Sequence, residues 1–161
     1  REVGSSDIAY VQVEAVLAQC DLFLNEGAAL QEKTQKAQKS WAQKEQNLQA
    51  EAAQLQEKYQ KGLITTNDAQ AQQQSIEKRV ASYQSSAQKE AQALDEENYV
   101  FTNRAQDLLH RAVQEINGDK KYKLIINATA LIDADSTLNI TPAVLAKVNE
   151  LYAADKKAVK K

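Results

Sequence analysis

The chain has 161 residues, 26% of them charged, and a formal net charge of -2 at pH 7. This length suits one ordinary domain, or a small body with an appendage. Alanine and glutamine dominate, and four glycines, one proline and few aromatic residues indicate long helices rather than a large core. The balanced charge argues against nucleic acid as the main partner, because phosphate binding needs a basic face.

Weaker signals concern membrane spans, export and the two ends of the chain. No stretch reaches the roughly eighteen apolar residues of a membrane span, and no signal peptide is present. Methionine is absent even at position 1, and residues 1–7 are typical of the stub left by a removed leader, which is compatible with export. The basic run at residues 156–161 favours a solvated tail over contact with an anionic surface.

The first part of the chain predicts a strand and a short helix. Residues 8–13 are partly β-branched and alternate in polarity, which indicates a strand. Residues 14–23 follow with the pattern of a short helix. The sequence Asn25-Glu26-Gly27 then predicts the first break in the chain.

Two long helices are expected between residues 28 and 116, folded back on each other as an antiparallel hairpin with its turn at Gly62. Their apolar and small residues recur mostly in steps of three and four, which is typical of a coiled-coil seam. Thr65 and Asp68 have the spacing of a capping box and indicate the second helix start, and Asn117-Gly118 indicates its end. The predicted seam consists of Leu30, Thr34, Ala37, Trp41, Leu48, Ala52, Leu55 and Tyr59, then Ile76, Val80, Tyr83, Ala87, Ala91, Leu94, Phe101, Ala105, Leu108 and Ala112.

The segment after the hairpin mixes strands with a last helix. Residues 122–127 read Tyr-Lys-Leu-Ile-Ile-Asn, and this apolar run predicts a second strand that is buried on both faces. Residues 130–132 are expected to add a third short strand. Thr141 as the N-cap and Pro142 at the first helical position predict the start of the last helix.

The sequence predicts an α+β fold, because the ends of the hairpin return to one place and bring the two strands together. A long antiparallel coiled-coil helical hairpin, residues 28–116, then projects from a small β-sheet body with a C-terminal helix, residues 1–27 and 117–161. Residues 1–27 and 117–155 of this body, about 65 residues, are close to the size at which a core barely stabilises itself. Assembly of several copies through the strands is the simplest way to cover its apolar faces.

Both ends of the chain carry specific motifs. Residues 8–17 read Ile-Ala-Tyr-Val-Gln-Val-Glu-Ala-Val-Leu, and residues 122–149 contain Ile125-Ile126-Asn127-Ala128, Leu131-Ile132-Asp133 and Asn139-Ile140-Thr141-Pro142. The first run resembles the opening strand and helix start of the Skp/OmpH-like family of periplasmic chaperones. The second is similar to that family's closing strand, aspartate-rich loop and helix, and the glutamine-rich hairpin matches the family in length and placement.

The resemblance implies a homotrimer. In that family the strands of three subunits form a β-sheet trimerisation body, and three helical tentacles surround a cavity. Members act as ATP-independent holdases there, without cofactors, and bind unfolded outer-membrane β-barrel proteins so that these do not aggregate. The implied location is the periplasm, with the signal peptide removed from the exported chain, and no enzyme activity is expected.

One feature departs from the family pattern. The best-known members are strongly basic and have positive tentacle tips, whereas this chain is slightly acidic. The charges near the turn leave one positive charge in excess: Lys58, Lys61, Lys78 and Arg79 against Glu57, Asp68 and Glu77. This balance puts in question the long-range electrostatic capture of clients and a weak contact with membrane or lipopolysaccharide.

A holdase needs weak, multiple and adaptable contacts rather than a closed pocket. Six hairpin residues are predicted to contact a client: Trp41, Leu55, Tyr59, Leu63, Ile64 and Tyr83. An exposed turn normally avoids apolar residues such as Leu63 and Ile64, although this pair equally suits closing the end of the hairpin. Leu55, Tyr59 and Tyr83 also fit the seam, and packing between the helices is favoured over client contact for them.

Six apolar strand residues are predicted to form the sheet and the subunit interface: Ile8, Tyr10, Val11, Leu124, Ile125 and Ile126. Their structural and functional roles coincide, because assembly is what creates the cavity. A polar substitution among them is therefore expected to separate the subunits.

Two other classes of function are alternatives. A non-enzymatic envelope spacer or adaptor would dock its hairpin onto another coiled coil and need no client. An enzyme would have to use Cys20 and His110 as a thiol–imidazole pair, but no third orienting residue or glycine-rich element accompanies them. One histidine and one cysteine also make a poor metal site. Cys20 is interpreted as a buried apolar thiol, and no catalytic or metal-binding residue is predicted.

Overall fold

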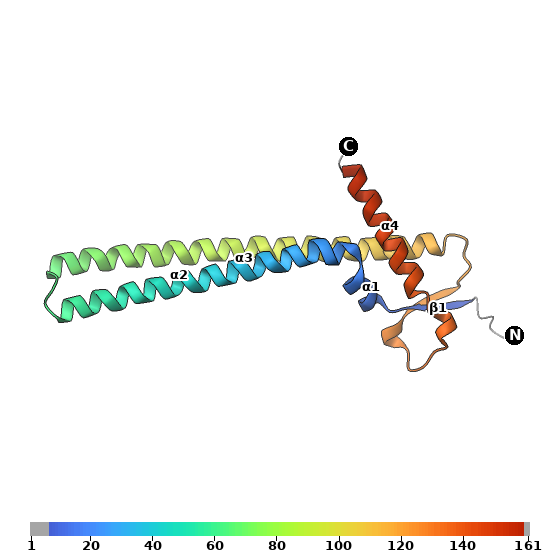
Figure 1. The fold of residues 1–161 in the computed structure, drawn as a ribbon, viewed down its shortest axis with the longest axis horizontal. Coiled ribbons are helices and arrows are strands. Elements are labelled where there is room, and N and C mark those ends of the chain that lie inside the picture. The colour runs from blue at the N-terminus through green and yellow to red at the C-terminus, as the bar shows by residue number, and fades with distance from the viewer. Residues whose placement is uncertain (1–6, 160–161) are drawn as a thin grey trace. The chain divides into compact units, whose positions relative to one another are not determined.

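The computed structural model describes residues 7–159 (Figure 1). Most of the expected leader stub and the last two lysines of the basic run lie outside the described residues. The helices and strands follow one another as β1 (Ile8–Val11), α1 (Val13–Gln19), α2 (Ala28–Gln60), α3 (Thr66–Ile116), β2 (Leu124–Asn127) and α4 (Thr141–Val159). Long helices with one small sheet confirm the predicted α+β fold class.

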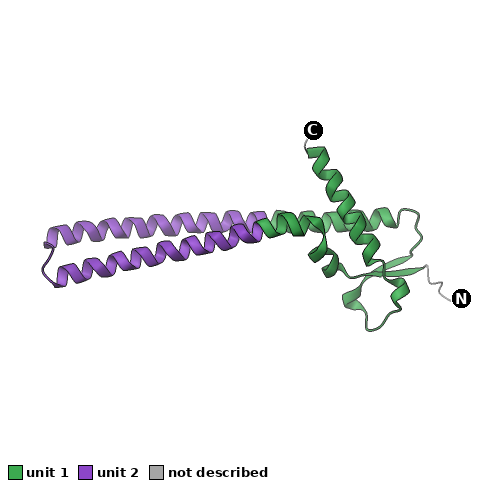
Figure 2. Cartoon of the chain, viewed as in Figure 1, with its two compact units in different colours: residues 1–29, 99–161 green, residues 30–98 purple. Residues whose placement is uncertain are grey.

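The chain divides into two compact units (Figure 2). Unit 1, here called the body, contains Arg1–Ala29 and Tyr99–Lys161, and unit 2, here called the hairpin unit, contains Leu30–Asn98. The helices α2 and α3 contribute residues to both units. The division of the chain into a hairpin tentacle, residues 28–116, and a body made of the remaining residues stays a prediction.

The hairpin unit consists of two antiparallel helical segments. Lys33 Nζ lies 2.7 Å from Glu97 Oε1, and Arg79 Nη1 lies 2.7 Å from Glu51 Oε2. Lys33, far from the turn on α2, therefore lies opposite Glu97, far from the turn on α3, as an antiparallel arrangement requires. Such exposed ion pairs contribute little stability each, so packing along the seam has to hold the two helices together.

The turn of the hairpin follows from local sequence. The N–H of Leu63 donates to the Lys58 carbonyl at 2.9 Å and that of Gly62 to the Tyr59 carbonyl at 3.1 Å, which is the Schellman pattern of a helix end. Gly62 has φ of 71°, a conformation that side chains with a Cβ disfavour. Thr65 Oγ1 then accepts the N–H of Asp68 at 3.2 Å, which confirms the predicted start of α3.

The seam of the hairpin unit is buried or half-buried along most of its length. Ala37, Leu55, Ile76 and Leu94 are at most 8% exposed, and the other predicted seam residues of this unit are mostly half-buried. Two seam positions depart from the pattern, because Ala52 is exposed and the Tyr59 side chain is 50% exposed. Both lie in the last turns of α2, where the seam opens.

The body is built around a two-stranded parallel sheet. Residue Ile8 pairs with Leu124 and Val11 with Asn127, so segments from the two ends of the chain lie side by side as predicted. On the other side of β1, the N–H of Ile140 donates to the Tyr10 carbonyl at 3.0 Å. Within residues 7–159, β2 has no strand on its outer side.

The core of the body joins β1, α1, α3 and α4. Its buried members are Val11, Val16, Cys20, Leu22, Leu108, Ala112, Val144, Val148 and Tyr152. Burial of Cys20 confirms its interpretation as a small apolar thiol. The second strand is less covered than predicted, because Leu124 is 51% exposed and Ile125 and Ile126 are only half-buried. Burial on both faces is therefore wrong for the single chain.

The predicted third strand is absent from the described residues, and a 3₁₀ turn, Ala128–Ala130, stands just before it. The side chain of Asn127 accepts the N–H of Thr129 at 3.2 Å, which turns the chain away from the sheet. Ile132 is fully exposed as a result.

The predicted break at Gly27 is also wrong. The short helix α1 ends earlier, and Cys20 is extended with ψ of 155°. A π-helical turn, Phe23–Gly27, leads from there directly into α2. A Cβ on Gly27 would lie 3.0 Å from Phe101 Cζ, so this glycine serves close packing against α3 rather than chain termination.

The predicted start of α4 is right, but Thr141 is not its cap. Asn139 Oδ1 accepts the N–H of Thr141 at 3.0 Å and takes the capping role. Thr141 Oγ1 instead accepts the N–H of Gln12 at 2.9 Å. The buried threonine thus ties the start of α4 to the end of β1.

Candidate functional site

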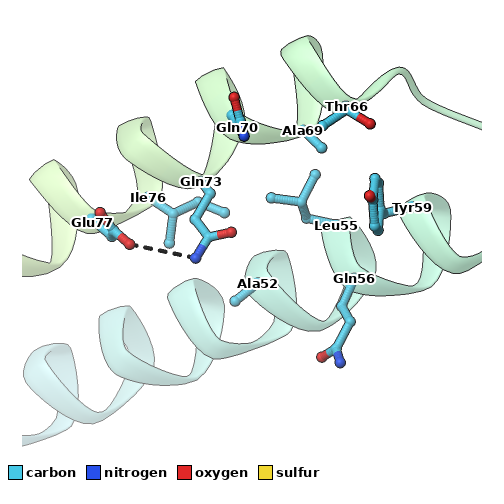
Figure 3. A pocket seen from close by; sticks show the side chains of 10 residues that line it. All are labelled: Ala52, Leu55, Gln56, Tyr59, Thr66, Ala69, Gln70, Gln73, Ile76 and Glu77. Carbon is cyan, nitrogen blue, oxygen red and sulfur yellow. Dashed lines mark hydrogen bonds between the residues drawn. The ribbon is translucent and has the colours of Figure 1, made fainter.

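A pocket of ≈ 560 Å³ opens between α2 and α3 in the last turns before the hairpin ends (Figure 3). Its lining residues recur at the helical seam spacing on both helices and include apolar side chains and amides. They are Ala52, Leu55, Gln56, Tyr59, Thr66, Ala69, Gln70, Gln73, Ile76 and Glu77. We call this cavity the turn pocket.

The turn pocket exists because small side chains occupy seam positions there. Leu55 and Ile76 point into the space between the helices (Figure 3) and are each 8% exposed. Ala52 and Ala69 are too short to fill the remaining volume, so the seam is left open beside them. Tyr59, half exposed, stands at the end nearest the turn.

A second pocket of ≈ 310 Å³ shares Leu55 and Ile76 with the turn pocket but differs in charge. Its other lining residues include Lys58 and the ion pair of Glu51 with Arg79. The guanidinium donates to both carboxylate oxygens, at 2.7 and 2.8 Å. This pairing lowers the pKa of Glu51 and raises the pKa of Arg79. We call this second cavity the charged pocket.

The six predicted client-contact residues fall into three groups. Leu55 and Tyr59 line the turn pocket, and Leu63 lies in the turn with 72% of its side chain exposed, next to the half-buried Ile64. Trp41 and Tyr83 lie further from the turn and connect the helices.

The tryptophan–tyrosine pair is held by polar contacts. Trp41 Nε1 donates to Glu90 Oε2 at 2.8 Å, and the hydroxyl of Tyr83 donates to the Trp41 carbonyl at 3.1 Å. Both side chains are half-buried. Trp41 and Tyr83 therefore hold α2 against α3, whether or not they also contact a client.

Several residues of the turn pocket were missed by sequence reasoning, which singled out large apolar side chains. Ala52 appeared only as a seam residue, and Ala69 and the glutamines Gln56, Gln70 and Gln73 drew no attention. A sequence signal did exist, because two alanines stand at the seam just before and just after the turn. Small residues there predict a gap in the packing.

The strand residues predicted at the interface divide between two faces. Alternate residues of a strand point to opposite faces, so the register places Ile8, Tyr10, Leu124 and Ile126 on one face. These four are half-buried or, for Leu124, mostly exposed. We call this surface the outer sheet face.

The other two predicted interface residues serve the body's own interior. Val11 is 2% exposed in the core and Ile125 packs against that core. Together with Val13, Val113 and His110 they also line a small pocket of ≈ 210 Å³.

Cys20 and His110 both lie within the described residues, 7–159, and do not contact each other. Cys20 is 1% exposed and its thiol donates to the Leu17 carbonyl at 3.5 Å, whereas the exposed His110 ring lies 3.3 Å from the amide of Gln114. In the same part of the chain, no three acidic, histidine or cysteine side chains gather where they could hold a metal ion. No helix there is long and apolar enough to cross a membrane.

Comparison with known proteins gives one family and one fold. The model of a family described as outer membrane protein (OmpH-like) matches residues 7–148. Among solved structures, a provisionally assigned outer membrane chaperone (OmpH-like) from Caulobacter crescentus is similar with a TM-score of 0.77 and 16% identity. The match covers 93% of this chain and 88% of that chain, and at this identity it shows the fold alone. No curated protein matches the chain.

Proposed function

We propose a function from the premise that this chain belongs to the OmpH-like family of outer membrane proteins. It acts as an ATP-independent holdase chaperone in the bacterial periplasm. Its clients are unfolded outer-membrane β-barrel proteins, which it keeps from aggregating while they remain unfolded. No nucleic acid, metal or cofactor takes part.

The observation that carries this proposal is the outer sheet face. Ile8, Tyr10, Leu124 and Ile126 present apolar side chains from a sheet of only two strands, and β2 offers an unpaired edge within the described residues. Exposed apolar sheet surface next to an open edge favours pairing with another chain. In the proposed homotrimer, this face and edge form the subunit interface.

Assembly gives the hairpins their role. Three copies joined through their bodies would present three hairpins to one client. On each hairpin Trp41, Tyr59, Leu63, Ile64 and Tyr83 are exposed or half-buried apolar residues, and Leu55 forms part of the buried floor of the turn pocket. Individually weak contacts add up when they act on the same chain, since each additional contact is made at a high effective concentration. Release then needs no chemistry, only an acceptor that binds the client more tightly.

The proposal is tested by diluting a urea-unfolded outer-membrane porin into buffer and following its light scattering. We expect the chaperone at a small molar excess to suppress the scattering, because enclosed clients cannot meet one another. Serum albumin at the same concentration is the control for nonspecific protection. Precipitation of the porin in the presence of the protein would contradict a holdase and favour an envelope spacer or adaptor.

A further inference from the structure

We propose that the turn pocket is a binding site for an uncharged, apolar segment of an unfolded polypeptide. The hairpin then has a binding side, which holds the turn pocket, and a solvated side, which holds the charged pocket. This inference rests on the proposed holdase function and adds to it a defined site and the chemistry of the segment that occupies it.

The two pockets differ in charge. They share the buried pair Leu55 and Ile76, so both offer the same apolar floor. Glu77 is the one charged residue that lines the turn pocket, and its carboxylate already accepts a hydrogen bond from the Gln73 amide at 3.4 Å (Figure 3). An apolar segment can therefore enter without displacing an ion pair.

The charged pocket imposes a cost that the turn pocket lacks. A segment entering it would have to remove water from Lys58 and from the ion pair that Glu51 and Arg79 form. Taking charged groups out of water is costly unless every lost contact is replaced. An uncharged segment cannot replace them, so it is directed to the turn pocket.

The lining of the turn pocket also matches the hydrogen-bonding groups of a polypeptide backbone. Gln56, Gln70 and Gln73 each carry an amide that both donates and accepts hydrogen bonds. A polypeptide backbone presents the same two kinds of group, which in an unfolded chain are hydrogen-bonded to water rather than to one another. Apolar side chains of the segment would then pack on Leu55 and Tyr59 while its backbone meets the amides.

The turn pocket is large enough, and open enough to solvent, to admit such a segment. The turn pocket, at ≈ 560 Å³, lies within the range of about 300–1,000 Å³ typical of ligand sites. It opens to solvent where Tyr59 is half exposed and Ala52 is exposed. A segment with one or two large apolar side chains can therefore enter from outside without separating α2 from α3.

Neighbouring residues on α2 test the two sides directly. A photoreactive benzoylphenylalanine is placed at Tyr59, which lines the turn pocket, or at Lys58, which lines the charged pocket. Each protein is then irradiated with a urea-unfolded porin freshly diluted into buffer. We expect crosslinking at position 59 to exceed that at position 58 by about fivefold, and equal yields would overturn the inference.

A matched pair of substitutions tests the same site by function. Ala52→Glu places a carboxylate in the turn pocket, whereas Ala53→Glu makes the same change one residue on, at an exposed position that lines neither pocket. The readout is the protein concentration that halves the scattering of unfolded porin. We expect Ala52→Glu to raise it about threefold to tenfold, because an apolar segment bound in the turn pocket would take the new carboxylate out of water, and Ala53→Glu to leave it unchanged.

The outcomes separate the two proposals. If the unsubstituted protein fails to suppress scattering at any concentration, the holdase function itself is wrong. If it suppresses scattering but Ala52→Glu and Ala53→Glu behave alike, the holdase function stands and the turn pocket is not its binding site. Circular dichroism of both variants shows whether the helices are intact, so a loss of folding is not mistaken for a loss of binding.

Discussion

Replacing Ile126 by aspartate is expected to convert the proposed homotrimer into single chains. Ile126 lies on the outer sheet face, in the strand whose outer edge is unpaired within residues 7–159. A carboxylate there would be taken out of water on assembly with no partner of opposite charge, which costs several kcal/mol. Light scattering of the eluting peak should give the mass of one chain instead of three.

Two further variants make this result interpretable. Leu124→Asp changes the same face at a residue that is 51% exposed, so the fold of the single chain is disturbed less and dissociation is still expected. Leu63→Asp makes the same kind of change at the hairpin turn, where the side chain is 72% exposed, and should leave the mass unchanged. If Ile126→Asp and Leu124→Asp both elute at the mass of the unsubstituted protein, the outer sheet face is not the interface.

Leu22→Ala is expected to destabilise the body severely. Leu22 is fully buried and is the largest such side chain in the core that joins β1, α1, α3 and α4. Removing a buried leucine side chain costs about 2–5 kcal/mol through lost burial and the cavity that remains. Since a folded domain is stable by only about 5–15 kcal/mol in total, this loss would greatly raise the fraction of molecules in which the body opens transiently.

Cys20 reports on this opening, because its thiol lies in the same core and is 1% exposed. Reaction with a chromogenic disulfide reagent should accelerate by about 30-fold or more in Leu22→Ala, since labelling requires the core to open. Leu24→Ala is the matched control, with the same change two residues on at a side chain that is 56% exposed. Equal labelling rates in the two variants would show that the core does not depend on Leu22.

The long helices could be predicted because their signals are local and repeated. Seam residues recur every three or four positions, Gly62 supplies the left-handed conformation at the turn, and Thr65 caps the next helix. Pairing of the two strands followed from the same hairpin, since helices that return to one place bring their flanking segments together. These conclusions needed no knowledge of tertiary contacts.

The errors arose where a tertiary contact overrode a local signal. Gly27 resembles a helix stop, but its missing side chain makes room for Phe101. Thr141 has the sequence of a cap, yet its hydroxyl accepts a hydrogen bond from Gln12, next to β1. Residues 130–132 are apolar enough for a strand, but the Asn127 side chain turns the chain beforehand.

The candidate sites were only partly predictable, because they depend on what packing leaves uncovered. The outer sheet face required the register of β1 against β2 to separate Ile8 and Ile126 from the buried Val11. The turn pocket required the knowledge that Ala52 and Ala69 leave a gap. Burial patterns of this kind emerge only when the two helices are placed against each other.

The most direct test of the account is the mass of the complex with a client. Protein and urea-unfolded porin are mixed, separated by size exclusion, and measured by multi-angle light scattering. A holdase that encloses its client between assembled hairpins predicts one porin with three chains in a single soluble peak. A porin bound by one chain alone, or three chains eluting without any porin, would contradict it.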